Sequence, residues 1–169
     1  SGVSTTQDIT VSGITVGTGN TDNKTNTALG QDALSNTTPT GNYNSAVGDK
    51  ALTSVTTGNN NSAVGFQSLV GLTEGSDNQA FGASSLLGVT TGSSNTGVGK
   101  NAGSTMSTGS NNTCIGYEAQ PSAPGVFNEV TIGNDDVTST RLKGDTSISA
   151  DLNVVKKVTC ANLTMVGFP

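Results

Sequence analysis

One short phrase, Asn-[Ser/Thr]-Ala-[aliphatic]-Gly, recurs at a constant spacing along this chain of 169 residues. It occurs in six copies, of which three match it fully and three carry one or two substitutions, and a degenerate seventh copy runs from Glu129 to Gly133. Its final residues, the anchor glycines, are Gly30, Gly48, Gly65, Gly82, Gly99, Gly116 and Gly133. Successive anchor glycines are 17 residues apart, except that the first step is 18 because of an extra residue near Pro39. A fixed period of this kind indicates a repeat architecture.

Other positions recur with the same period, and each set forms a column. The asparagine column, four residues before each anchor glycine, is Asn26, Asn44, Asn61, Asn78, Asn95 and Asn112. The pre-glycine column is Leu29, Val47, Val64, Phe81, Val98, Ile115 and Ile132. Four and seven residues after the glycine come the leucine column (Leu34, Leu52, Leu69, Leu86) and the valine column (Val55, Leu72, Val89, Met106). Two columns hold small residues: the first is Ala28, Ala46, Ala63, Ala80, Gly97 and Cys114, and the second is Ala33, Ala51, Ser68, Ser85, Ala102 and Ala119.

The period predicts an all-β fold. Seventeen residues are too few for a helix pair, which needs more than about 30 residues per repeat. Glycine and asparagine in every copy favour short extended pieces joined by turns. We therefore predict a parallel β-solenoid with one 17-residue coil per repeat, in which strands stack about 4.8 Å apart. An interwoven triple β-helix, in which three chains share each turn, is the alternative.

The columns also predict an inside and an outside. We expect the apolar columns, the pre-glycine column included, to fill the coil, and the asparagine amides to bond to one another and to turn backbone. Three large apolar residues per coil do not offset the entropy of ordering 17 residues. Adjacent strand residues point to opposite faces, so we expect the small residues to pack against neighbouring chains, with a fit into tight corners as the alternative. A homotrimer is therefore predicted.

The repeats divide the chain into three predicted segments. Residues 1–20 form a lead-in strand or cap, with alternating apolar residues on either side of a bulge at Gly13. Residues 21–133 form the solenoid. Residues 134–169 form a C-terminal β cap or clamp, because Ile148, Ala150, Leu152 and Val154 alternate and a second strand is expected from Val158 to Met165.

The composition argues against two classes of partner, nucleic acids and membranes. The chain has seven Lys and Arg and a formal net charge of −5, with no basic patch, so we expect no nucleic-acid binding. No run of 18 apolar residues is present, and we expect no membrane insertion. The two cysteines form no disulfide framework: Cys114 falls in a small-residue column, and Cys160 lies outside the repeats without an evident partner.

The repeated Asn-Ser-Ala-Val-Gly-x-x-Ala-Leu, the lead-in Ile9-Thr-Val and the exit Val130-Thr-Ile-Gly-Asn…Thr140-Arg-Leu-Lys-Gly-Asp resemble bacteriophage tail-fibre and related viral appendage proteins over almost the whole chain. The resemblance implies a trimeric virion fibre that contacts other fibre proteins and a host-surface glycan or protein. The Ala-Val-Gly phrase is also similar to the head repeats of bacterial trimeric autotransporter adhesins, which implies a bacterial cell-surface location instead.

We expect no enzymatic activity, cofactor or bound metal. The chain has no histidine, the commonest general base and metal ligand. The carboxylate pairs Glu74/Asp77 and Asp135/Asp136 are interpreted as solvated turn residues. Outward aromatic residues are the candidate receptor contacts, namely Phe66 and Tyr117 after anchor glycines and Tyr43 in a turn; packing between chains is their alternative role. An ice-binding solenoid is a further alternative, because Thr40, Thr57, Thr91 and Thr108 share a column, although Asp22 and Glu74 interrupt it.

Overall fold

The computed structural model describes residues 9–18, 25–36 and 40–143. It divides into two units, Ser1–Val137 and Thr138–Pro169, and the account below concerns the first. The strands predicted around Ile148 and after Val158 lie outside the described residues, as does Cys160.

The described chain begins with a β-hairpin. Strands β1 (Ile9–Val11) and β2 (Ile14–Gly17) pair antiparallel, and β2 pairs antiparallel with β3 (Thr27–Gly30). The two turn residues, Ser12 and Gly13, have φ of 51° and 84°, which matches the tight turn that suits the twist of a two-residue hairpin. The bulge predicted at Gly13 is therefore wrong, because Gly13 completes a turn between two strands.

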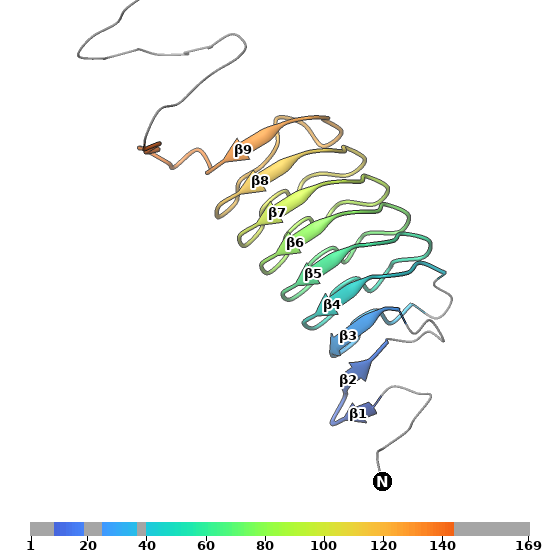
Figure 1. The fold of residues 1–169 in the computed structure, drawn as a ribbon. Helices are drawn as coiled ribbons and strands as arrows, with labels where there is room; N and C mark the ends of the chain where they lie inside the picture. Colours follow the sequence, from blue (N-terminus) through green and yellow to red (C-terminus); the bar gives the residue numbers. More distant parts are fainter. Residues whose placement is uncertain (1–8, 19–24, 37–39, 144–169) are drawn as a thin grey trace, which may run out of the picture. The chain divides into compact units, whose positions relative to one another are not determined.

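From β3 onward the fold is a parallel β-solenoid of about six turns, as predicted (Figure 1). Each coil contributes one short strand to the sheet, and each strand pairs in parallel with the next along the chain. The further strands are β4 (Ser45–Val47), β5 (Ser62–Val64), β6 (Gln79–Phe81), β7 (Thr96–Val98), β8 (Thr113–Ile115) and β9 (Val130–Ile132). The strand pairing therefore runs from coil to coil within one chain.

Backbone hydrogen bonds continue around the coil beyond the strands. At one corner the Lys50 N–H donates to the Gln31 carbonyl at 2.8 Å, and at another the Asn60 N–H donates to the Asn42 carbonyl at 3.0 Å. The anchor glycines permit this close stacking. Gly82 has φ 138°, and a Cβ there would lie 2.5 Å from the carbonyl oxygen of Gly99, so no larger residue fits.

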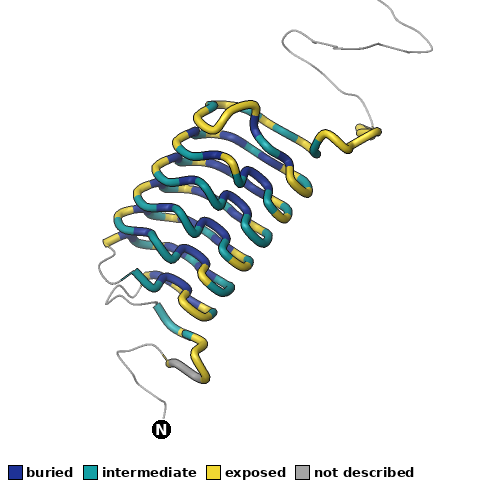
Figure 2. Tube along the Cα trace, turned by 180° about the vertical axis from the view of Figure 1, so that it is seen from behind, coloured by how far each residue is buried: buried dark blue, intermediate teal, exposed yellow. Residues whose placement is uncertain are grey.

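Buried residues recur in successive coils (Figure 2). They form the core and comprise apolar columns and one polar column. The leucine and valine columns are fully buried, and so are both small columns. The leucine column turns a corner at positive φ, for example 51° at Leu69 and 50° at Leu86, a region that few non-glycine residues adopt. Burial of the side chain compensates for this backbone conformation.

The asparagine column is a buried amide ladder. The Asn78 Nδ2 donates to Asn61 Oδ1 at 3.1 Å and to the Gly92 carbonyl at 2.9 Å. Its Oδ1 accepts from the backbone N–H and from Nδ2 of Asn95, at 3.0 and 3.1 Å. The same pattern recurs at Asn61, Asn95 and Asn112. Each amide thus joins its own corner to the neighbouring coils, with donors and acceptor all satisfied.

Candidate association face

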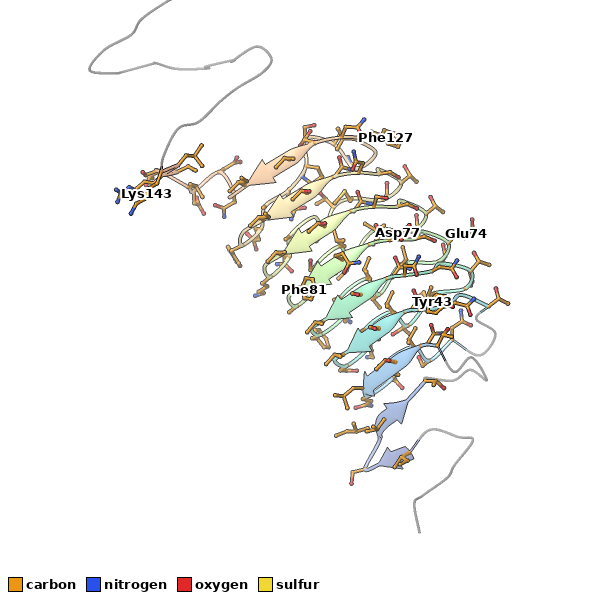
Figure 3. All side chains as sticks on the ribbon, viewed as in Figure 1. Tyr43, Glu74, Asp77, Phe81, Phe127 and Lys143 are labelled. Carbon is orange, nitrogen blue, oxygen red and sulfur yellow. The ribbon has the colours of Figure 1, made fainter. Side chains whose placement is uncertain are left out.

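The pre-glycine column lies on the outside of the solenoid, contrary to the sequence prediction. Six of its seven residues are exposed, with exposed fractions from 39% at Val98 to 58% at Ile132, and Val47 is half-buried. Figure 3 labels Phe81, which is 44% exposed on β6. The first small column, predicted to face neighbouring chains, is instead buried inside the coil, with Ala63 and Ala80 both 0% exposed. This part of the prediction is wrong.

The reason for the reversal is the space inside the coil. The leucine column fills the interior from the opposite side, and only a small residue fits between it and the strand. At Gly97 even an added Cβ would lie 2.8 Å from Leu86 Cγ and 2.5 Å from Ser85 Oγ. Because strand residues alternate, an inward alanine places the residue before the anchor glycine outside.

Two columns border the pre-glycine column. The hydroxyl column, three residues before each of the first six anchor glycines, is Thr27, Ser45, Ser62, Gln79, Thr96 and Thr113, with Gln79 as its one member without a hydroxyl. The post-glycine column is Gln31, Asp49, Phe66, Ala83, Lys100, Tyr117 and Asn134. The hydroxyl column carries no charge, and the post-glycine column carries only Asp49 and Lys100. The face is therefore an apolar row between two nearly uncharged rows.

The candidate receptor contacts do not form one site. Phe66 and Tyr117 are 48% and 55% exposed in the same column but three coils apart, about 14 Å at the strand spacing. Tyr43 is 64% exposed with φ 59° at the corner that precedes β4. Figure 3 shows Tyr43 near the starting ends of the strands, on the same side as Glu74 and Asp77.

Tyr117 has two charged neighbours. The Lys100 Nζ lies 5.9 Å from the centre of its ring, within range of a cation–π interaction. The Glu118 carboxylate, which accepts a hydrogen bond from the phenol and repels its ionised form, raises the pKa of Tyr117. The phenol is therefore a hydrogen-bond donor over the whole neutral range of pH.

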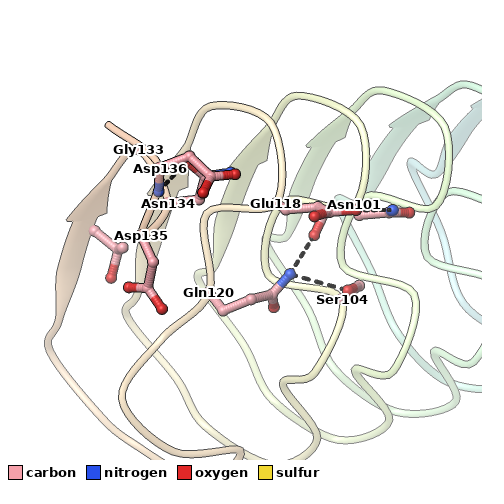
Figure 4. Close-up of a pocket in the computed structure, with 9 residues that line it drawn as sticks. Asn101, Ser104, Glu118, Gln120, Gly133, Asn134, Asp135 and Asp136 are labelled. Atoms are coloured by element: carbon pink, nitrogen blue, oxygen red, sulfur yellow. Dashed lines mark hydrogen bonds between the residues drawn. The ribbon is translucent and has the colours of Figure 1, made fainter. Parts of the chain in front are cut away.

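The carboxylate pairs lie in turns. Glu74 and Asp77 are exposed on either side of Gly75 and Ser76, and Asp77 accepts a hydrogen bond from Asn60 Nδ2 at 3.1 Å. Asp135 and Asp136 are exposed after β9 and help to line an open polar cavity of about 470 Å³ (Figure 4).

The cavity forms where the last coil leaves the repeat. Its other lining residues are Asn101, Ser104, Glu118, Gln120, Thr131, Gly133 and Asn134. Gln120 replaces a leucine of the leucine column, and its Nε2 donates to the Asn101 carbonyl at 2.6 Å and to Ser104 Oγ at 3.0 Å. Within the described ranges, no three His, Cys, Asp or Glu side chains are placed to hold a metal ion.

One of two adjoining threonine columns forms hydrogen bonds between coils, and the other is exposed. The hydroxyls of Thr56, Thr73 and Thr90 donate to the carbonyl one coil further on, at 2.9 to 3.3 Å. The adjoining column of Thr57, Thr91 and Thr108 is exposed, and Glu74 interrupts it.

Cys114 is buried in the first small column as a free cysteine, and burial raises the pKa of its thiol. A buried, protonated thiol is a small apolar side chain rather than a nucleophile.

Comparison with protein-family models, curated proteins and solved structures finds no match to this chain. No helix long and apolar enough to cross a membrane occurs in the part of the chain that the structure describes.

Proposed function

We propose that the chain is a structural segment of a homotrimeric fibre, a virion appendage of the phage type that contributes to attachment to the host. The observation that carries the proposal is the pre-glycine column, a row of exposed large apolar side chains that runs from coil to coil along the solenoid. A contiguous exposed apolar patch of this kind marks an interaction site. A partner that covers this row must extend along the stack.

The energy available from this row supports association. Full burial of such a side chain contributes roughly 1.5–3 kcal/mol, so covering an exposed fraction near 40% contributes about 1 kcal/mol per residue. Seven residues in each of three chains give about 20 kcal/mol. That is comparable with the roughly 4–15 kcal/mol lost at each of two association steps, before any contribution from the flanking columns.

The continuous ladder supports a mechanical role. Backbone bonds and asparagine amides join every coil to the next from Asn44 to Asn112, with no insertion between coils. Each coil contacts its nearest neighbours, as in other repeat proteins, so added coils lengthen the segment without changing its cross-section. This arrangement suits a spacer that holds an attachment site away from a particle.

The location is testable by immunogold electron microscopy. Antibody raised against this chain is applied to virus particles released by the producing host and to the producing cells themselves. Gold on the particle appendages is the expected result. Gold confined to the bacterial surface favours an adhesin and contradicts the fibre, and so do particles without gold.

The attachment role is testable by a glycan array and a host-cell binding assay. Tyr43→Ala, Phe66→Ala and Tyr117→Ala are compared with the unmodified chain. Tyr43 lies at the corner before β4, outside the three columns of the association face. We therefore expect Tyr43→Ala to weaken binding by about tenfold or more without changing the oligomeric state. Binding that is unchanged in all three variants removes these aromatic residues as receptor contacts.

A further inference from the structure

The pre-glycine column is straight with respect to the stack. Strand pairing aligns Val47 with Val64, then with Phe81, Val98, Ile115 and Ile132, one residue per coil without a register shift. The row therefore follows the direction in which the coils are stacked. A partner that covers the whole row must follow the same direction.

Symmetry then restricts how three copies can share this row. Closed oligomers of one chain are usually symmetric, and three copies require a three-fold axis. A row that runs along the stack can face that axis over its full length only if the axis is parallel to the stack. Rotation about such an axis keeps every copy pointing in the same direction and every residue at the same height.

From this geometry, which rests on the proposed trimer, we infer that three copies pack in parallel and in register with the pre-glycine column facing the three-fold axis. The hydroxyl column of each copy then lies against the post-glycine column of the next. Each residue of the pre-glycine column meets its own counterparts at one level, so that Phe81 packs beside Phe81 and Val98 beside Val98.

The flanking columns are compatible with this packing. A three-fold axis brings opposite flanks of neighbouring copies together, so the charged residues Asp49 and Lys100 meet the uncharged hydroxyl column. No like charges come together across the contact. Phe66 and Tyr117, in the post-glycine column, become rim residues of the contact, whereas Tyr43, at the corner before the hydroxyl column, belongs to none of the three columns.

An antiparallel pair about a two-fold axis makes different contacts. It places the post-glycine column against itself and pairs each coil with a different coil. In this pair Asp49 contacts Lys100 only if the two-fold axis passes midway between the coils of Phe66 and Ala83. The last coil then has no counterpart in the other copy, and Ile132 stays exposed. The two arrangements differ in which positions meet their own counterparts.

Cysteine cross-linking separates them. Val64→Cys and Val98→Cys are made singly in a Cys160→Ser background and treated with a short bismaleimide, and products are separated on denaturing gels. Thr91→Cys, exposed on a different column, is the matched control. Parallel, in-register packing predicts that both test variants cross-link to themselves and that the control does not.

The yield of cross-linked dimer reports how many chains surround the axis. Three cysteines around one axis leave one unpaired, so at most two thirds of the chains become dimers on the gel. Self-cross-linking at only one of the two positions overturns the parallel register, and complete conversion to dimers overturns the three-fold axis. A trimer by light scattering in which neither position cross-links refutes the face while leaving the proposed trimer intact.

A charge placed in the row gives a second measurement. Phe81→Asp puts three carboxylates together at the axis, while the side chain lies outside the coil and is 44% exposed. We expect light scattering to show a shift to a folded monomer, with the circular dichroism spectrum retained. Thr91→Asp is the control and keeps the mass of the unmodified chain; Phe81→Asp that remains trimeric overturns the inference.

Discussion

The asparagine ladder provides the sharpest test of what holds the coils together. Asn78→Ala removes one amide from the middle of the stack. The backbone N–H of Asn95 then loses its acceptor, 3.0 Å away, and the Gly92 carbonyl loses a donor that lies 2.9 Å away. Asn95 Nδ2 loses the same acceptor, 3.1 Å away, but keeps its bond to the Gly109 carbonyl. Asn61 Oδ1 still accepts from the backbone N–H of residue 78, at 3.0 Å.

The magnitude follows from the groups left without partners. Leaving one buried donor or acceptor unsatisfied costs about 1–3 kcal/mol. Two such groups, together with the small cavity left by the amide, predict a loss of about 3–6 kcal/mol in the free energy of unfolding. Asn60→Ser is the matched control, because Asn60 is exposed and the same corner position carries serine at Ser94. Its loss should stay below about 1 kcal/mol.

The assay is urea denaturation followed by circular dichroism at one fixed chain concentration, since association contributes to the measured stability. The expected result is a much lower midpoint for Asn78→Ala with a spectrum unchanged before the transition. If Asn78→Ala and Asn60→Ser unfold within 1 kcal/mol of each other, the buried ladder does not stabilise the stack and the reasoning fails.

Three other substitutions test separate parts of the structure. Ala80→Leu adds volume inside a coil that is already filled, so we expect a loss of about 3 kcal/mol or more in urea denaturation, and a stability equal to that of the unmodified chain would contradict the inward direction of this residue. Gly92→Ala places a Cβ 2.1 Å from a backbone oxygen of the next coil and should prevent stable folding. Gly125→Ala places its Cβ at an ordinary contact distance, 3.5 Å from the Thr108 hydroxyl oxygen, and should leave the thermal midpoint unchanged. The hydroxyl and the backbone N–H of Ser122 donate hydrogen bonds to the Glu129 carboxylate and lower its pKa. Their stabilisation is present above the ordinary carboxyl pKa and is lost as the pH falls through the lowered one. Ser122→Ala removes the hydroxyl bond and should raise the Glu129 pKa toward its ordinary value in an NMR titration, and an unchanged value would contradict that bond.

The period was sufficient to predict the solenoid, because residues at the same position of every coil meet the same neighbours and select the same residue type. The inside and outside of the strand could not be predicted from the period alone. Alternation separates Ala63 from Val64 but does not state which of them faces the coil interior. Apolarity favours Val64 as the inner residue, and the structure places it outside.

A signal for the correct direction was present in the asparagine column. Asn61 and Ala63 lie two residues apart and therefore share a face of the strand. An amide that bonds to the equivalent amide and to a turn carbonyl of the neighbouring coils must point inward, which places the alanine inward as well. The hairpin at Gly13 had a signal too, since two alternating runs separated by the two residues Ser12 and Gly13 are typical of a tight turn.

The candidate functional site depends on contacts that a single chain does not define. The cavity beside Asp135 and Asp136 forms because Gln120 and Thr131 replace apolar residues where the repeat ends. The three-dimensional position of Tyr43, away from Phe66 and Tyr117, depends on the corner geometry and not on the spacing of aromatic residues.

Light scattering coupled to size-exclusion chromatography tests the central claim most directly. The exposed pre-glycine column and the proposed fibre both predict a folded particle of about three times the 16.8 kDa of the chain, with a mass that is constant over a wide range of concentration. A folded, stable monomer that keeps the apolar row exposed to water would contradict the association face and the fibre proposed from it.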